Sequence, residues 1–119
     1  MPTFEPGDII AVPFPYVDRP VGERRPALVV VDGLGLHGQL AWVLMITSAS
    51  NAAWPDDIPI DPADAPSGLR VPSVVRTSKL ATIEAAAGRK IGAASADVLA
   101  DVRRILARRV STPTPQTRP

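Results

Sequence analysis

Apolar segments of strand length, separated by Pro, Gly and charged residues, follow one another through most of the chain. Their lengths and their content of Val, Ile, Leu and Thr indicate β-strands. Six segments have this character: residues 8–14, 26–32, 39–47, 57–61, 71–77 and 79–83. The third is the longest strand candidate, and Pro59 in the fourth predicts a short edge strand because proline cannot donate a ladder hydrogen bond.

A helical periodicity replaces this pattern after Ser95. Ser95 is suited to cap a helix, and Asp97 in the first turn is favoured by the helix dipole. Apolar residues then recur at helical spacing and arginines gather toward the end: Val98, Leu99, Val102, Ile105 and Leu106, with Arg103, Arg104, Arg108 and Arg109. We expect this helix to pack on the sheet rather than to read nucleic acid.

Short strands with Pro- and Gly-rich connections and one late helix predict a small, strongly bent antiparallel sheet that closes toward a barrel. The fold class is therefore α+β, mainly β, with a single domain over residues 1–110. Residues 111–119 are expected to be a disordered tail because three prolines and no apolar anchor occur there. His37 is predicted to be a turn residue, and Trp42, in the middle of a strand, a core residue.

The composition excludes several classes of chemistry. At 119 residues the chain has no cysteine and one histidine, so it offers no disulfide framework and no thiolate or His-based metal site. We accordingly predict no metal and no cofactor. We expect no signal peptide, because Glu5 and Asp8 interrupt the first residues, and the longest apolar run, residues 40–46, is too short to span a bilayer. We expect a cytoplasmic protein with no membrane partner.

The net charge of +1 conceals an asymmetry. Residues 1–69 contain three Arg and nine acidic residues, which gives −6, and residues 70–119 contain ten basic and three acidic residues, which gives +7. A positive half is compatible with a polyanionic partner, although such charges are commonly a solvated face.

Two adjacent arginines provide the first candidate site. Arg24 and Arg25 precede Pro26, which is suited to the first residue of a strand, so both arginines are expected where a loop meets the sheet. A guanidinium held there is well placed to bind a phosphate in bidentate fashion.

The same stretch resembles the opening of the MazF/PemK family, the toxins of bacterial toxin–antitoxin pairs. The resemblance covers residues 7 to about 106, and its blocks occur in the family's order. They are Gly7-Asp8, Val12-Pro13-Phe14-Pro15, Arg24-Arg25-Pro26-Ala27-Leu28-Val29, Ile46-Thr47-Ser48, Trp54-Pro55, and Pro72-Ser73-Val74-Val75-Arg76 with Lys79-Leu80. It implies an SH3-like barrel, the fold shared by MazF, PemK and CcdB toxins.

The resemblance also implies site residues. Arg25, Thr47 and Arg76 match catalytic positions of the family. An RNA-binding set follows from the same motifs and from the loop aromatics: Tyr16, Glu23, Arg24, Ser48, Trp54, Ser78 and Lys79. Tyr16 and Trp54 would stack unpaired bases, or else cover the barrel or a subunit interface.

One departure from the family concerns the general base. Where the PemK pattern has Asp and Gln after the arginine, this chain has Ser78 and Lys79. A serine cannot accept a proton unaided at neutral pH, so Glu23 and Asp18 become substitute candidates.

The implied function is a metal-independent endoribonuclease that cleaves single-stranded RNA through a 2′,3′-cyclic phosphate. The implied partners are a cognate antitoxin and a second copy of the chain in a homodimer. Two alternatives stay open: a CcdB-like toxin that binds gyrase, and a family member that has lost catalysis and survives as a binding module.

Overall fold

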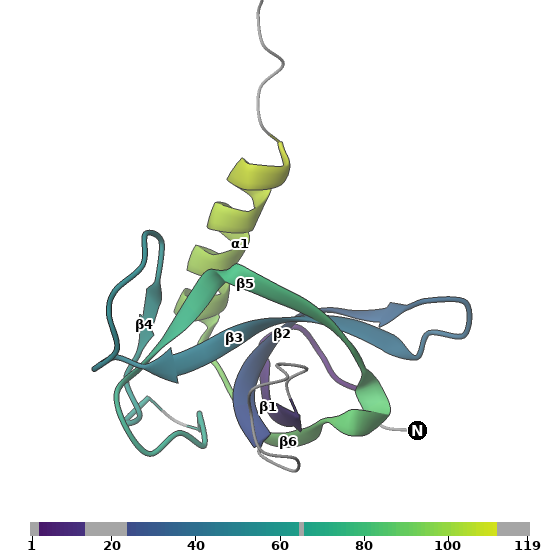
Figure 1. The fold of residues 1–119 in the computed structure, drawn as a ribbon, viewed down its shortest axis with the longest axis horizontal. Coiled ribbons are helices and arrows are strands. Elements are labelled where there is room, and N and C mark those ends of the chain that lie inside the picture. The colour runs from purple at the N-terminus through teal and green to yellow at the C-terminus, as the bar shows by residue number, and fades with distance from the viewer. Residues whose placement is uncertain (1–2, 14–23, 65, 112–119) are drawn as a thin grey trace, which may run out of the picture.

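The computed structural model describes residues 3–13, 24–64 and 66–111, and it contains a curled antiparallel sheet with one helix outside it (Figure 1). In the described residues the strand order is β4-β5-β3-β2-β1-β6. The elements are β1 (Asp8–Pro13), β2 (Arg24–Leu34), β3 (Leu40–Ser48), β4 (Ile58–Ile60), β5 (Ser73–Glu84), the 3₁₀ turn η1 (Ala85–Ala87), β6 (Arg89–Ala93) and α1 (Ala96–Val110). The predicted mainly β barrel-like fold with a C-terminal helix is confirmed.

Both faces of the sheet are buried, which explains why the strands are apolar at consecutive positions. Val29 and Val43 point into the curl and belong to an inner core that also contains Phe4. Leu28 and Leu44 point outward into an outer core. Each fully buried Val or Leu side chain contributes roughly 1.5–3 kcal/mol of transfer free energy.

The outer core is closed by α1, which contributes Val98 and Val102. The helix begins as predicted, because the Ser95 hydroxyl accepts a hydrogen bond from the amide N–H of Val98 at 3.2 Å. Arg108 and Arg109 lie in its last turn, where cations interact favourably with the helix dipole. The prediction of a packing helix is confirmed.

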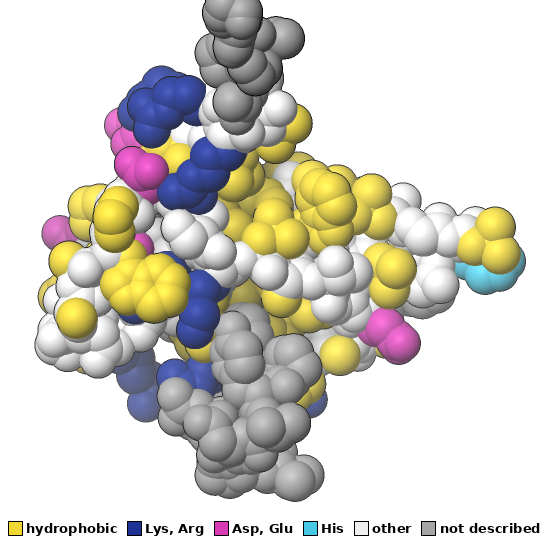
Figure 2. All heavy atoms as spheres, turned by 45° about the horizontal axis from the view of Figure 1, so that its top comes forward, with side chains coloured by type: hydrophobic (Ala, Val, Ile, Leu, Met, Phe, Trp, Pro, Cys, Tyr) yellow, Lys and Arg dark blue, Asp and Glu magenta, His cyan; other side chains and the backbone are white. Residues whose placement is uncertain are grey.

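Trp42 is not a core residue, contrary to the prediction, because 41% of it is exposed. It lies on the sheet face that α1 covers, but one step beyond Leu44, where that cover ends. Together with Leu80 and Val110 it borders an apolar groove of about 270 Å³ beside the helix. Figure 2 shows a continuous hydrophobic area in this region.

The segment predicted as two strands, 71–77 and 79–83, forms the single strand β5. Met45 pairs with Arg76 and Leu44 pairs with Leu80, so the three residues between Arg76 and Leu80 have no partner in β3. This large bulge bends β5 near α1 (Figure 1). With 12 residues β5 is also longer than β3, which has nine, so the prediction that β3 is the longest strand is wrong.

β2 differs from its predicted bounds at both ends. Arg24 and Arg25 are strand residues, paired with Pro13 and Val12 of β1, and Pro26 is therefore inside the strand rather than at its start. At the other end β2 continues to Leu34, so the hairpin loop is shorter than predicted. His37 lies in that loop as expected.

β4 and β6 are the two edge strands of the sheet in the described residues. The edge strand predicted at Pro59 is confirmed, since β4 pairs with β5 at the end of that strand order. β6 was not predicted, and it pairs with β1. The predicted tail lies outside the described residues apart from Ser111, which caps the end of α1.

Candidate functional site

The three predicted catalytic residues lie on the adjacent strands β2, β3 and β5. Ala27 is opposite Met45, and Met45 is opposite Arg76, so all three point to one face of the sheet. Arg25 and Thr47 are each two residues along from this row and therefore share its face. The fold thus brings Arg25, Thr47 and Arg76 to one face of the sheet, although the sequence separates them widely and Arg76 does not line the cleft described next.

A cleft of about 580 Å³ lies at the strand ends, where residues from both faces of the sheet line it. Both Arg25 and Thr47 line it. Three further arginines line it as well: Arg24, Arg70 and Arg89. No Asp or Glu occurs among the described residues that line the cleft, so its charge is strongly positive.

The segment 66–73 forms one wall of this cleft and spans it from β6 to β3. At one end the N–H of Ala93 donates to the carbonyl of Pro66 at 3.0 Å, and at the other the N–H of Ala49 donates to that of Pro72 at 2.9 Å. Gly68 permits the close approach: it has φ +75°, and a Cβ there would lie 2.1 Å from the carbonyl oxygen of Ile91. Arg70 is held in the middle of this span.

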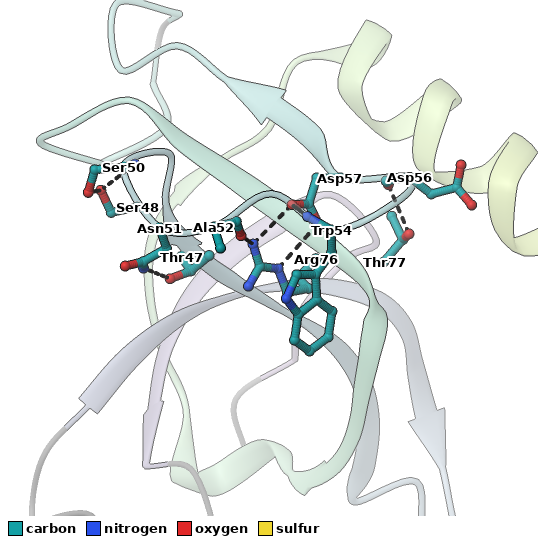
Figure 3. A network of polar contacts seen from close by, with 10 residues as sticks. All are labelled: Thr47, Ser48, Ser50, Asn51, Ala52, Trp54, Asp56, Asp57, Arg76 and Thr77. Atoms are coloured by element: carbon teal, nitrogen blue, oxygen red, sulfur yellow. Dashed lines mark hydrogen bonds and ion pairs between the residues drawn. The ribbon is translucent and has the colours of Figure 1, made fainter.

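Thr47 is oriented by Asn51, which sequence reasoning missed. The Asn51 side-chain amide donates to Thr47 Oγ1 at 2.6 Å (Figure 3). A hydroxyl has one proton and two acceptor lone pairs, so accepting from Asn51 leaves the Thr47 proton available to donate. Ser48 is engaged differently: its hydroxyl lies 2.9 Å from that of Ser50 in the adjacent turn.

Arg76 is buried and paired. Its Nε donates to Asp57 Oδ1 at 3.2 Å, and its Nη2 donates to Asp57 Oδ2 at 3.0 Å and to the carbonyl of Ala52 at 2.7 Å (Figure 3). The side chains of the ion pair are only 10% and 8% exposed. Arg76 therefore ties β5 to the loop 49–57, the same loop that carries Asn51.

Trp54 covers this ion pair. The Arg76 guanidinium carbon lies 4.4 Å from the centre of the Trp54 ring, and Lys79 Nζ lies 5.5 Å from it. Trp54 is 40% exposed. Ser78 is exposed in the β5 bulge close by in sequence. Trp54 thus contacts both Arg76 and Lys79, and none of Trp54, Ser78 and Lys79 lines the cleft of Arg25 and Thr47.

The end of the same loop is fixed to α1. Asp56 adopts φ +66°, which is unfavourable for a residue other than glycine. Its carboxylate lies 3.0 Å from Arg109 and 3.7 Å from Arg108, and its carbonyl accepts from the Thr77 hydroxyl at 2.9 Å. These contacts hold the strained residue in place.

Three of the residues predicted from the sequence lie outside the described part of the chain: Tyr16, Asp18 and Glu23. Arg24 lines the cleft but also forms a hydrogen bond within the protein, since its Nη1 donates to the carbonyl of Ala87 at 2.9 Å. Arg70 and Arg89 were missed because only their charge distinguished them, although the +7 of the C-terminal half was a signal.

Two properties of the described parts of the chain bear on the site. Within residues 3–13, 24–64 and 66–111, no three acidic or histidine side chains are grouped so as to hold a metal ion. In the same residues no helix combines the length and the apolar character needed to cross a bilayer.

The curled sheet, the outer helix and the arginine-lined cleft define a small barrel-like protein with a basic site at its strand ends. Residues 5–110 match the profile of the PemK-like, MazF-like toxin of type II toxin-antitoxin system family. Because this match covers most of the chain, the protein belongs to that family. No curated protein sequence matches the chain.

Solved structures agree with this fold. A MazE-MazF crystal structure (Form-II) from Deinococcus radiodurans has a TM-score of 0.68 at 21% identity, covering 95% of this chain and 100% of that one. The Mycobacterium tuberculosis toxin MazF-mt6 has a TM-score of 0.63 at 19% identity, covering 90% and 99%. An endoribonuclease in complex with its cognate antitoxin from Mycobacterial species has a TM-score of 0.66 at 15% identity, covering 97% and 100%.

Proposed function

We propose that this toxin is a metal-independent, sequence-specific endoribonuclease that acts on single-stranded RNA in the cytoplasm. Family membership supports a toxin, and one structural relative is described as an endoribonuclease. The observation that carries the proposal is that Arg25 and Thr47 line one cleft with three further arginines. Such a cleft suits a phosphodiester, whose charge grows in the transition state.

The proposed reaction is an internal transfer. The RNA 2′-oxygen attacks the adjacent phosphorus, the bond from phosphorus to the 5′-oxygen breaks, and a 2′,3′-cyclic phosphate forms. The 2′-hydroxyl proton passes to a base, and the departing 5′-oxygen gains a proton to become a 5′-hydroxyl. No metal is required for this balance.

Arg25 and Thr47 act on the phosphate in this proposal. The guanidinium of Arg25 and the hydroxyl of Thr47 donate to the non-bridging oxygens as negative charge develops. One preorganised donor of this kind contributes on the order of 3 kcal/mol to transition-state stabilisation. Asn51 keeps the Thr47 proton directed away from its own amide.

Catalytic contact by Arg76 stays a prediction of the family resemblance. Its hydrogen bonds to Asp57 and Ala52 favour a positioning role, in which Arg76 holds the loop that carries Asn51. The general base also stays a prediction. Glu23, next to Arg24 in the chain, is the first candidate, because Ser78 replaces the aspartate of the PemK pattern.

The partners are part of the proposal. A homodimer would cover the apolar groove beside α1, where Trp42, Leu80 and Val110 are 41%, 45% and 85% exposed. A cognate antitoxin is proposed because two of the similar structures are toxin–antitoxin complexes. Sedimentation of wild type and Leu80→Asp tests the dimer. We expect wild type to be dimeric at micromolar concentration and Leu80→Asp, which places a charge in the groove, to be monomeric. A monomeric wild type contradicts the proposal.

The activity is tested with purified protein and a long single-stranded RNA in excess EDTA, followed by mapping of the new ends. We expect cleavage at a short recurring sequence, with 2′,3′-cyclic phosphate and 5′-hydroxyl ends. Loss of cleavage in EDTA with recovery in Mg²⁺ would exclude the mechanism. No cleavage in either condition would favour the gyrase-binding or inactive-member alternatives.

Two variants locate the site. Arg25→Ala and Thr47→Ala should each abolish cleavage while the melting temperature changes little. Thr82→Ala, an exposed threonine of β5, and Arg104→Ala, an exposed arginine of α1, are matched controls that should stay active. If Arg25→Ala or Thr47→Ala unfolds, that residue is structural, and if both cleave RNA normally, the nuclease site lies elsewhere.

A further inference from the structure

We propose that Arg70 and Arg89 form a second phosphate-binding subsite, which holds an RNA phosphate other than the one that is cleaved. The inference rests on the proposed nuclease function and extends it along the substrate. It assigns a role to two arginines that the family motifs do not mark.

The position of Arg89 separates it from the proposed point of cleavage. Arg89 is opposite Ala11 of β1, and Ala11 is opposite Pro26 of β2. Successive residues of a strand point to opposite faces, so Arg89 shares the face of Pro26, and Arg25, the neighbour of Pro26, points to the other face. A phosphate bound by Arg25 and Thr47 on their face would therefore leave Arg89 to a different one.

Arg70 lines the same cleft from the opposite wall. Two residues earlier, Gly68 is packed against the backbone of Ile91 in β6, and Ile91 is two residues after Arg89. Both Arg89 and Ile91 line the cleft. The two arginines thus face one cleft from segments held together by backbone contacts.

The charge of this end of the cleft favours an anion. Within the part of the chain that the structure describes, neither Arg70 nor Arg89 forms an ion pair with a carboxylate. Both side chains are exposed. Two guanidinium groups directed at one cleft repel each other unless an anion lies between them, and a planar guanidinium matches a phosphate well.

The ligand group is a backbone phosphate rather than a base. The described residues that line the cleft include no aromatic ring on which a base could stack. The exposed ring of Trp54 lies by Arg76 instead. A subsite of this kind strengthens binding without reading sequence, so its loss should raise KM and leave kcat and the cleaved sequence unchanged.

The test is equilibrium binding of a fluorescein-labelled, fully 2′-O-methylated RNA, which cannot be cleaved, at 50 to 300 mM salt. Wild type is compared with Arg70→Gln, Arg89→Gln and the double variant. For single strands, log K falls with log salt by about 0.7 per phosphate contact. We expect the slope of the double variant to be about 0.7 smaller than that of wild type, and each single variant to bind more weakly at 100 mM salt.

Arg104→Gln is the control, because Arg104 is an exposed arginine of α1 that does not line the cleft. It should leave both the slope and the affinity unchanged. All of the substituted side chains are exposed, so each variant should fold, and circular dichroism is used to check this. Kinetics on a cleavable RNA complete the test, with kcat at saturating RNA expected to match wild type.

The outcomes separate the two proposals. RNA cleavage by wild type, with the same salt slope in the double variant, overturns the subsite alone. A lower kcat with unchanged KM also overturns it, since the arginines would then act on the scissile phosphate. If wild type cleaves no RNA but the salt slope still depends on Arg70 and Arg89, the nuclease proposal fails and the phosphate contact stands. Absence of any binding by wild type overturns the subsite.

Discussion

Asp57→Ala is expected to destabilise the fold strongly, because it removes the partner of a buried cation. Asp57 accepts two hydrogen bonds from Arg76 and a third from the backbone N–H of Trp54 at 2.9 Å. Arg76 is 8% exposed, so its guanidinium would stay in a poorly solvated position without a counter-charge. The loop 49–57 would lose its main attachment to β5.

The magnitude follows from these contacts. Removing one partner of a buried ion pair typically costs about 3–5 kcal/mol. The carbonyl of Ala52 and the ring of Trp54 keep interacting with Arg76, and a desolvated cation–π contact can retain about 2 kcal/mol. We therefore expect a loss near the lower limit, about 3 kcal/mol. For a domain of this size that is a fall in Tm of roughly 10 °C.

Urea denaturation followed by far-UV circular dichroism, at one fixed protein concentration, measures this loss. Asp101→Ala is the control: its ion pair with Arg104 has side chains 45% and 65% exposed, and its removal should cost about 0.5 kcal/mol or less. Equal losses in the two variants would refute the reasoning. A second check is Asp57→Ala combined with Arg76→Met, which should be more stable than Asp57→Ala alone because no charge is then buried.

Three further predictions concern the helix cap, the cleft wall and the general base. Ser95→Ala should cost about 1 kcal/mol in urea denaturation, through loss of the hydrogen bond to the Val98 N–H; an unchanged midpoint would show that the cap contributes nothing. Gly68→Ala should cost clearly more than Gly33→Ala. Both have positive φ, at about 1–2 kcal/mol for an alanine, but only at Gly68 does the new Cβ meet backbone, while at Gly33 nothing lies within 4 Å. Equal costs would show that the wall can move aside. Ser78→Asp should leave kcat unchanged, because Ser78 does not line the cleft of Arg25 and Thr47; a rise in kcat toward the ~10²–10⁴-fold of a well-positioned base would instead place the reaction beside Arg76 and count against Glu23.

The sequence predicted most elements correctly because their signals are local. Ser95 marks the start of α1 through its own capping chemistry, and Pro59 marks an edge strand through its missing N–H. β6 had no such signal. Its residues include adjacent Arg89 and Lys90, and pairing with β1 rather than intrinsic preference makes them a strand.

The errors of prediction depend on distant contacts. Trp42 has the sequence environment of a core residue, but its burial is decided by how far α1 extends over the sheet. The bulge that joins two predicted strands into β5 likewise arises from the register against β3. Neither can be read from a local pattern.

The candidate site was predicted only where motifs mark it. The resemblance selected Arg25 and Thr47, and the register of β2 and β3 places them on one face. It could not show that Arg76 is paired with Asp57, since the two residues meet only across the loop 49–57. It also gave no reason to select Asn51, Arg70 or Arg89, whose roles depend on the tertiary arrangement of the cleft.

The arrangement of the outer core has a consequence for biosynthesis. This core joins Ile9 of β1 to Val98 and Val102 of α1, the first described strand to the last described element. Contacts between such distant parts of a chain form late, because a long loop must close first. At a synthesis rate of about 5–20 residues per second, a growing chain exposes the helix-facing side of its sheet until α1 has left the ribosome. We expect ribosome-bound chains that end before Val98 to be digested by protease, and chains with α1 fully emerged to be resistant. The toxin would then acquire its fold, and with it any activity, only after the whole domain has been translated.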